Sequence, residues 1–288
     1  IKKAYKPLPM LDSVDHVIIA VEDLEEASKN YEMILGNPPV WRGEHKEFGT
    51  KNTLFNFQNT YLELLAAGGE GIGADLIKHT LKNNGEGLNG IVFGTSDINQ
   101  FRTTMQKNSF NLADASPGEG VNLETGEKRT WINQFLVPEL SRGLFSFIIE
   151  HTSGKLTKFS KYSDSSVHRL DHVVISTNDA EGFIKTYRDI FKIRLALDKF
   201  VEHWQKRMLF FRLNKTTIEV IEEKNQNDAI DKLWGLAWNV GDLASCRERL
   251  MKLGVDATEI KKGVKEGTLV MTIKSHTHSV PTLFIEHT

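Results

Sequence analysis

A strand that begins with a histidine occurs twice in this chain, and this repeat limits the possible folds more than any other feature. Residues 14–20 and 170–176 are apolar, β-branched runs of the kind that predict buried strands. His16 and His172 take the same position in the two runs and lie 156 residues apart. The spacing predicts two halves that fold alike.

Each histidine is followed, 47 residues later, by a glutamate inside a second apolar run. Glu63 lies in residues 61–65, and Glu219 lies in residues 217–221. A carboxylate in a buried strand is costly unless it is paired or bound to a metal ion. Because the same costly residue recurs in register, we predict a polar site in each half.

Length and composition favour a two-domain protein that binds neither nucleic acid nor a membrane. The chain has 288 residues, a formal net charge of −2 and one cysteine, Cys246, which excludes an internal disulfide. It contains no apolar run of about 18 residues, and its first residues lack the apolar core of a signal peptide. We therefore expect a cytoplasmic protein.

The order of apolar and amphipathic stretches predicts an α+β fold. Four βαβββ units follow one another, with helices expected near residues 22–35, 98–107, 180–191 and 243–253. Paired units form two domains, at residues 1–152 and 168–288, and the polar residues 153–167 form a linker. Since one four-stranded sheet buries only one face, each pair of curved, mixed sheets is expected to enclose a cavity.

With these features, the chain resembles the vicinal oxygen chelate superfamily, which includes glyoxalase I, methylmalonyl-CoA epimerase, bleomycin resistance proteins and extradiol dioxygenases. The first half is similar to the glyoxalase-like domain family at residues 15–17, 49–54, 61–64 and 147–150, and at His45 and Trp131. The second half matches only the general pattern. The resemblance implies two glyoxalase-like domains.

The resemblance also implies a divalent metal ion, held by residues from the first and last strands of the units. The implied ligands are His16, Glu63 and Glu150 in the first half and His172, Glu219 and Glu286 in the second. A fourth ligand position falls on Gly90 and Gly235, so both halves depart from the full pattern. One imidazole and two carboxylates suit Zn, Ni, Co, Mn or Fe. The alternative is a buried His–carboxylate cluster without a metal.

Other residues are candidates for contact with a substrate. His45 and His203 fall at similar places in the repeat, and His45 is a candidate general base. Arg129 and Trp131 share one face of a strand and could hold an anionic or planar substrate, or form a rim ion pair and a core aromatic. Residues 68–73 are expected to form a flexible, glycine-containing loop, with a lid as one interpretation.

Three functions remain open at this stage. The first is metal-dependent isomerase or lyase chemistry through an enediolate, with Glu63, Glu150 or His45 moving the proton. The second is Fe(II)-dependent ring cleavage, and the third is metal-free binding of a small molecule. The richer motif content favours the first half as the active one. Either a monomer or a homodimer is expected.

Overall fold

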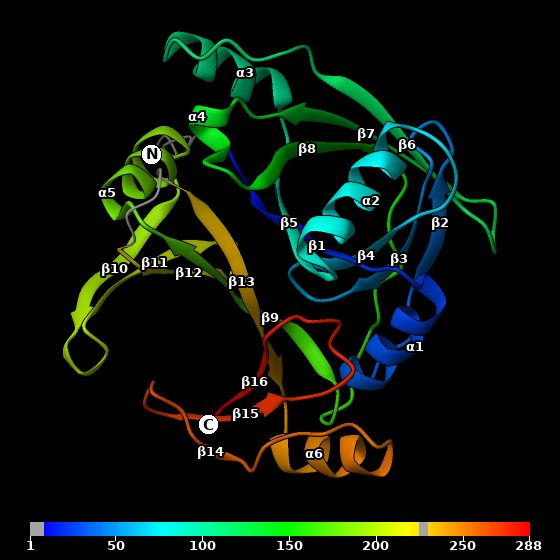
Figure 1. Cartoon of the computed structure of the whole chain (residues 1–288), viewed down its shortest axis with the longest axis vertical. Helices are drawn as coiled ribbons and strands as arrows, with labels where there is room; N and C mark the ends of the chain where they lie inside the picture. Colours follow the sequence, from blue (N-terminus) through cyan, green and yellow to red (C-terminus); the bar gives the residue numbers. More distant parts are fainter. Residues whose placement is uncertain (1–8, 225–229) are drawn as a thin grey trace, which may run out of the picture.

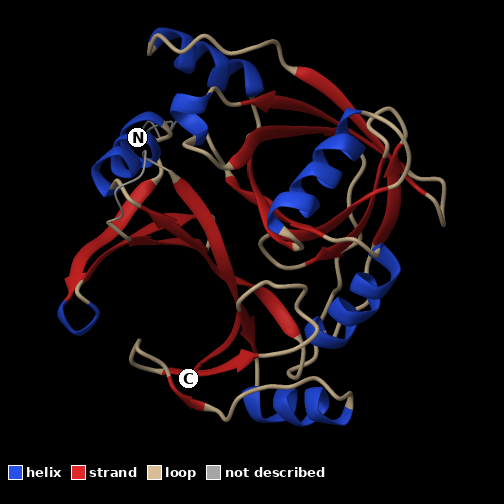
Figure 2. Ribbon diagram, viewed as in Figure 1, coloured by secondary structure: helices blue, strands red, loops and turns tan. Residues whose placement is uncertain are grey.

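The computed structural model describes residues 9–224 and 230–288, which form two α+β domains (Figures 1 and 2). The first domain contains β1 (Ser13–Ala20), α1 (Leu24–Leu35), β2 (Trp41–His45), β3 (Thr50–Asn56), β4 (Tyr61–Ala67), α2 (Ile72–Asn84), β5 (Gly87–Gly94), α3 (Ile98–Lys107), β6 (Ser116–Asn122), β7 (Lys128–Phe135), α4 (Pro138–Ser141) and β8 (Phe145–Ser153).

The second domain repeats the order of the strands and of the helix of each unit after residues 154–166, but α2 and α4 have no counterpart among its described residues. It contains β9 (Val167–Thr177), α5 (Ala180–Ile184), the π-helical turn η1 (Lys185–Ile190), β10 (Arg194–Val201), the short 3-10 helix η2 (Glu202–Trp204), β11 (Lys206–Leu213), β12 (Thr216–Glu222), β13 (Asp231–Val240), α6 (Leu243–Lys252), β14 (Lys261–Lys262), β15 (Thr268–Ile273) and β16 (Thr282–His287). The predicted α+β fold of paired βαβββ units is confirmed. None of the helices in the described residues is both long and apolar enough to cross a membrane.

An aspartate begins the helix of each unit. The side chains of Asp23, Asp97, Asp179 and Asp242 each accept a hydrogen bond from the backbone N–H three residues later. This contact satisfies one of the free amides of the first helical turn and places a negative charge at the positive end of the helix dipole. The repeated cap explains why every unit turns from strand to helix at the same point.

The two sheets differ in closure. In the first domain the strands form a closed barrel in the order β1-β4-β3-β2-β6-β7-β8-β5, and the pairing of β2 with β6 closes it at Gly43–Asn122 and Glu44–Val121. In the second domain the order β10-β11-β12-β9-β13-β16-β15-β14 leaves an open sheet, with β10 and β14 at its edges (Figure 2). Only the first domain therefore surrounds its interior with strands.

One apolar core joins the two domains. Phe57 of the first domain packs on Trp238 of the second, with ring centroids 4.8 Å apart, and Phe93 meets Tyr187 edge-on at 6.0 Å. These four side chains are almost completely buried. The domains therefore pack as one body instead of moving as independent units.

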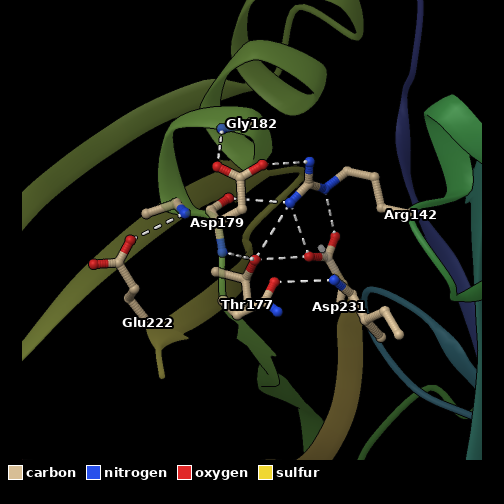
Figure 3. Close-up of polar contacts among 9 residues, drawn as sticks. Arg142, Thr177, Asp179, Gly182, Glu222 and Asp231 are labelled. Atoms are coloured by element: carbon tan, nitrogen blue, oxygen red, sulfur yellow. Dashed lines mark hydrogen bonds and ion pairs between the residues drawn. The ribbon is translucent and has the colours of Figure 1, made fainter. Parts of the chain in front are cut away.

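A polar network also crosses the domain boundary (Figure 3). Arg142 follows α4, and its guanidinium donates to both carboxylate oxygens of Asp231 at 2.8 and 3.1 Å. Thr177 donates to the same carboxylate at 2.7 Å, and Asp179 lies 3.3 Å from the guanidinium. The Asp231 side chain has no exposed surface, so its charge depends on these partners.

Replacement of Arg142 by methionine leaves the buried Asp231 carboxylate without its cation. We expect the free energy of unfolding to fall by about 3–5 kcal/mol, the range for breaking a buried ion pair on one side. Urea unfolding followed by circular dichroism measures the change. Lys252→Gln, which removes an exposed pair with Glu248, is the control and should change little. Equal unfolding midpoints for the two variants would contradict this account.

Candidate functional site

The first barrel encloses a cavity of about 340 Å³. This volume lies within the range of small-molecule sites, which is about 300–1,000 Å³. Polar side chains gather on part of its wall, and they include His16, His45, Asn52, Glu63, Arg129 and Asn133. The rest of the wall is apolar and includes Ile18, Leu65, Ile77, Phe145, Phe147 and Ile149.

The helix α2 covers part of this cavity and was not predicted. Its residues Ile72, Leu76 and Ile77 line the cavity, although the Ile72 side chain is also 75% exposed. The sequence predicted a flexible loop over residues 68–73, whereas in the structure a helix begins at residue 72. The apolar residues that recur at helical spacing after residue 72 could have predicted this helix.

His16 and Glu63 lie side by side because β1 and β4 are parallel neighbours. The register pairs Ile18 with Glu63, and His16 Nε2 lies 4.0 Å from Glu63 Oε1. The imidazole stacks on Tyr61, with ring centroids 4.4 Å apart. Both the histidine and the glutamate are more than nine-tenths buried. His16 and Glu63 therefore lie close together, as the repeat predicted.

Asp15, which the sequence analysis did not select, fixes the histidine. Its carboxylate lies 2.7 Å from His16 Nδ1 and 2.8 Å from His151 Nε2. Burial alone would raise the pKa of Asp15, but the hydrogen bonds from His151 and His16 outweigh it and hold this pKa well below its usual range. An ionised Asp15 accepts the Nδ1 proton of His16, which leaves Nε2 directed to Glu63.

Asn52 holds the glutamate from the neighbouring strand. Its Nδ2 donates to Glu63 Oε2 at 2.7 Å, while its own Oδ1 is buried and has no hydrogen-bond partner in the structure. A buried amide oxygen without a partner carries a desolvation cost. Asn52 therefore fixes the Glu63 carboxylate in the wall of the cavity.

His45 also lines the cavity. Its Nδ1 lies 2.9 Å from Thr50 Oγ1, and its ring meets Trp131 edge-on at 5.8 Å. Burial lowers the pKa of His45 below the ordinary imidazole value, against the opposing effect of the Glu63 charge. His45 is therefore a neutral imidazole at pH 7 and can accept a proton.

Arg129 and Trp131 both line the cavity. The Arg129 guanidinium lies 5.4 Å from the ring centroids of Trp41 and Tyr61 and 5.9 Å from that of Trp131. Glycines make room for the two indoles, since a Cβ on Gly118 would fall 2.0 Å from Trp131 Nε1. In place of the rim ion pair that was one expectation, the structure has a buried guanidinium among aromatic rings.

The expectation that Glu150 and Glu286 face the cavities is wrong. Strand alternation puts Phe147 and Ile149 on the cavity side of β8, so Glu150 points away and accepts a hydrogen bond from the Ile98 amide at 3.5 Å. Glu286 accepts one from the Leu243 amide at 3.0 Å. Both carboxylates therefore meet the positive ends of helices, α3 and α6, instead of a metal site.

Alternation also explains His151 and His287. Each histidine follows a glutamate in its strand and therefore lies on the opposite face from that glutamate. His151 and His287 bind Asp15 and Asp171 at 2.8 and 2.6 Å.

The model of the family described as "Glyoxalase-like domain" matches residues 14–191, more than half of the chain. The chain belongs to this family. A second model, described as "Glyoxalase/Bleomycin resistance protein/Dioxygenase superfamily", matches residues 171–272. The predicted resemblance is thereby confirmed for both halves. A search of curated protein sequences gave no match.

Solved structures share the fold of this glyoxalase-like protein at low identity. A mutant of 4-hydroxymandelate synthase from Streptomyces coelicolor has 14% identity and a TM-score of 0.67, over 97% of this chain and 93% of its own. A Mn(II)-bound glyoxalase from Novosphingobium aromaticivorans has 14% identity and a TM-score of 0.65, over 97% and 83%. A hypothetical protein from Staphylococcus aureus has 13% identity and a TM-score of 0.64, over 94% and 98%. At such identities the likeness concerns the fold alone.

The second glyoxalase-like domain also contains a histidine–glutamate pair, but its two side chains lie closer together than those of the first pair. His172 Nε2 lies 3.3 Å from Glu219 Oε2, and His172 Nδ1 lies 3.0 Å from Asp171. Burial raises the pKa of Glu219 above the usual carboxyl range. Strand register places Met208 where the first domain has Asn52, so no amide holds Glu219 away from the histidine.

Two further residues of the first cavity have aliphatic counterparts in the second domain. By register, Leu197 takes the place of Trp41, and Val201 takes the place of His45. The sequence spacing suggested that His203 corresponds to His45, but the strand register shows that it does not. It lies exposed in η2 beside Trp204, so its expected contact with a cavity is wrong. Among the described residues, the first domain combines the polar pair with a closed barrel, whereas the second domain carries its pair on an open sheet.

A metal ion in this family member would find a limited set of ligands. In residues 9–224 and 230–288, no three His, Cys, Asp or Glu side chains converge in a way that could hold an ion. The first site offers one imidazole from His16 and one carboxylate from Glu63. This donor set fits a borderline or hard divalent ion that keeps positions open for water or substrate oxygens.

The surroundings of His45 predict how this residue titrates, and the titration can be measured without a substrate. In a proton NMR titration His45 should titrate below the ~6.5 of free imidazole. Because the Glu63 charge raises the pKa of His45, Glu63→Gln should move the titration to still lower pH. Glu219→Gln, the matching change in the second domain, should leave it unchanged. A titration above that of free imidazole, or no response to Glu63→Gln, would contradict the assignment.

Proposed function

We propose that the first domain is the active site of an isomerase or lyase that moves a proton on a carbon next to a carbonyl or hydroxyl group. The observation that carries this proposal is the convergence of His16, Glu63 and His45 on one enclosed cavity with largely apolar walls. Proton transfer at carbon needs a base and a way to stabilise the negative charge that develops on oxygen. Walls of low polarity strengthen both effects, because charges interact more strongly beside them than in water.

His45 is the proposed base. Its low pKa keeps the imidazole unprotonated at neutral pH, so the rate should stay constant until the pH falls through that lowered pKa. Glu63 is already engaged by Asn52 and His16, which suits it to positioning rather than to proton transfer. Glu150, the other carboxylate expected to take part, is excluded from the role because it faces α3.

His16 and Glu63 mark the oxygen end of the substrate in this proposal, because their acceptor atoms could hold a cation there. Asp15 keeps the imidazole in a fixed orientation, and Asn52 does the same for the carboxylate. A divalent ion, when bound, would be held by His16 and Glu63 and would supply a Lewis acid for adjacent substrate oxygens. The Mn(II)-bound glyoxalase of the same fold supports a divalent ion, here Zn, Ni, Co, Mn or Fe.

The two other functions receive less support. Ring cleavage by Fe(II) uses two histidines and one carboxylate, whereas one imidazole, that of His16, lies next to Glu63. The earlier candidate for a second ligand position, Gly90, faces Ile18 and Phe145. Binding of a small molecule without a metal ion would not require the contacts that link Asp15 to His16 and Asn52 to Glu63.

The test is exchange of carbon-bound hydrogen for deuterium, followed by NMR in D₂O with and without Mn²⁺. A panel of 2-oxo acids, 2-hydroxyketones and 2-hydroxyaldehydes covers the substrate class. The wild-type protein should catalyse exchange on at least one member, and His45→Asn should slow it by at least about 100-fold, the usual contribution of a general base.

Glu219→Gln is the matched control for Glu63→Gln, because the two glutamates occupy the same strand position. We expect Glu63→Gln to lose exchange and Glu219→Gln to keep it in full. Absence of exchange across the panel, or equal rates for the two variants, would overturn the proposed function.

A further inference from the structure

Arg129 carries a buried charge that the protein leaves unbalanced. Its side chain lines the first cavity and is only 5% exposed, and its Nε has no hydrogen-bond partner. Across the described ranges 9–224 and 230–288, no carboxylate lies within ion-pair distance of this guanidinium, although other arginines, such as Arg142 and Arg207, have such partners. Burying an unpaired cation is costly.

The aromatic box around Arg129 offsets part of that cost and fixes the guanidinium. Trp41, Tyr61 and Trp131 surround it at 5.4–5.9 Å, which is within cation–π range. These rings carry no formal charge, so the full positive charge stays available to a ligand. A guanidinium presents its N–H donors in a planar fork that binds a carboxylate through two parallel hydrogen bonds.

We propose that the first cavity selects a monoanionic carboxylate with an apolar body, and that Arg129 binds its carboxylate group. The inference specifies the substrate of the proposed enzyme site and rests on that function. Arg129 and Glu63 are the charged groups of fixed sign on the cavity wall, and there is no lysine on it. A single cation suits a single negative charge, whereas a dianion would face the Glu63 carboxylate with one charge unmatched.

The remaining wall defines the rest of the ligand. Leu65, Ile77 and Phe147 belong to a cluster of apolar side chains along the cavity, which suits an aromatic ring or a short aliphatic chain. Asn133, on the same strand as Arg129, also lines the cavity. Its amide is a polar group at which a hydroxyl group of the ligand could form a hydrogen bond.

Isothermal titration calorimetry with carboxylates and their neutral amides tests the proposal. The probe pairs are phenylacetate and phenylacetamide, 1-naphthylacetate and 1-naphthylacetamide, and octanoate and octanamide. We expect the wild-type protein to bind at least one carboxylate about tenfold or more tightly than its amide, because a charge-assisted fork forms only with the carboxylate.

Arg129→Met should remove this preference while amide binding stays within about threefold of the wild-type value, which also shows that the variant is folded. Arg129→Lys, which keeps the charge but loses the fork, should give an intermediate preference and serves if the methionine variant does not fold. Arg212→Met changes an exposed arginine of the second domain and should bind as the wild type does.

Equal binding of carboxylate and amide, a preference that survives Arg129→Met, or no binding of any probe would overturn the proposal. Because calorimetry measures binding and not catalysis, it tests this inference separately from the proposed function. Selective carboxylate binding without hydrogen exchange contradicts the proposed function alone, and exchange on neutral ketones without carboxylate selectivity contradicts this inference alone.

Discussion

Closure of the first barrel through the β2–β6 pairing is the contact on which the rest of the account depends. It converts two half-covered sheets into one enclosed space, and charges inside that space interact through a medium less polar than water. In the second domain the equivalent edges, β10 and β14, do not meet, and β14 is only two residues long. The same chain thus carries one enclosed polar site and one open copy of its central pair.

The sequence predicts what local periodicity and strand pairing control. Repetition of His16 and Glu63 as His172 and Glu219 was enough to place both pairs, because β1 and β9 each run parallel to the strand that carries the glutamate. The units and the fold class followed from the same repeat. Strand alternation gave no information on which face of β8 is concave, so Glu150 was assigned to the wrong face.

The parts that the sequence did not predict depend on contacts between distant segments. Asn52 reaches Glu63 across the β3–β4 pairing, and Asp15 becomes recognisable only once His151 lies beside it. The helix α2 was hidden by the glycines that precede it. Such residues look ordinary in sequence, because their function comes from burial without a partner or from a partner far along the chain.

The central claim is that the first domain alone holds the functional polar centre. Titration of Mn²⁺ monitored by electron paramagnetic resonance, with the wild-type protein, His16→Ala and His172→Ala, tests it most directly. The account predicts that the wild-type protein binds the ion, that His16→Ala loses this binding, and that His172→Ala keeps it. Loss of binding in His172→Ala with retention in His16→Ala, or no binding by the wild-type protein, would contradict the account.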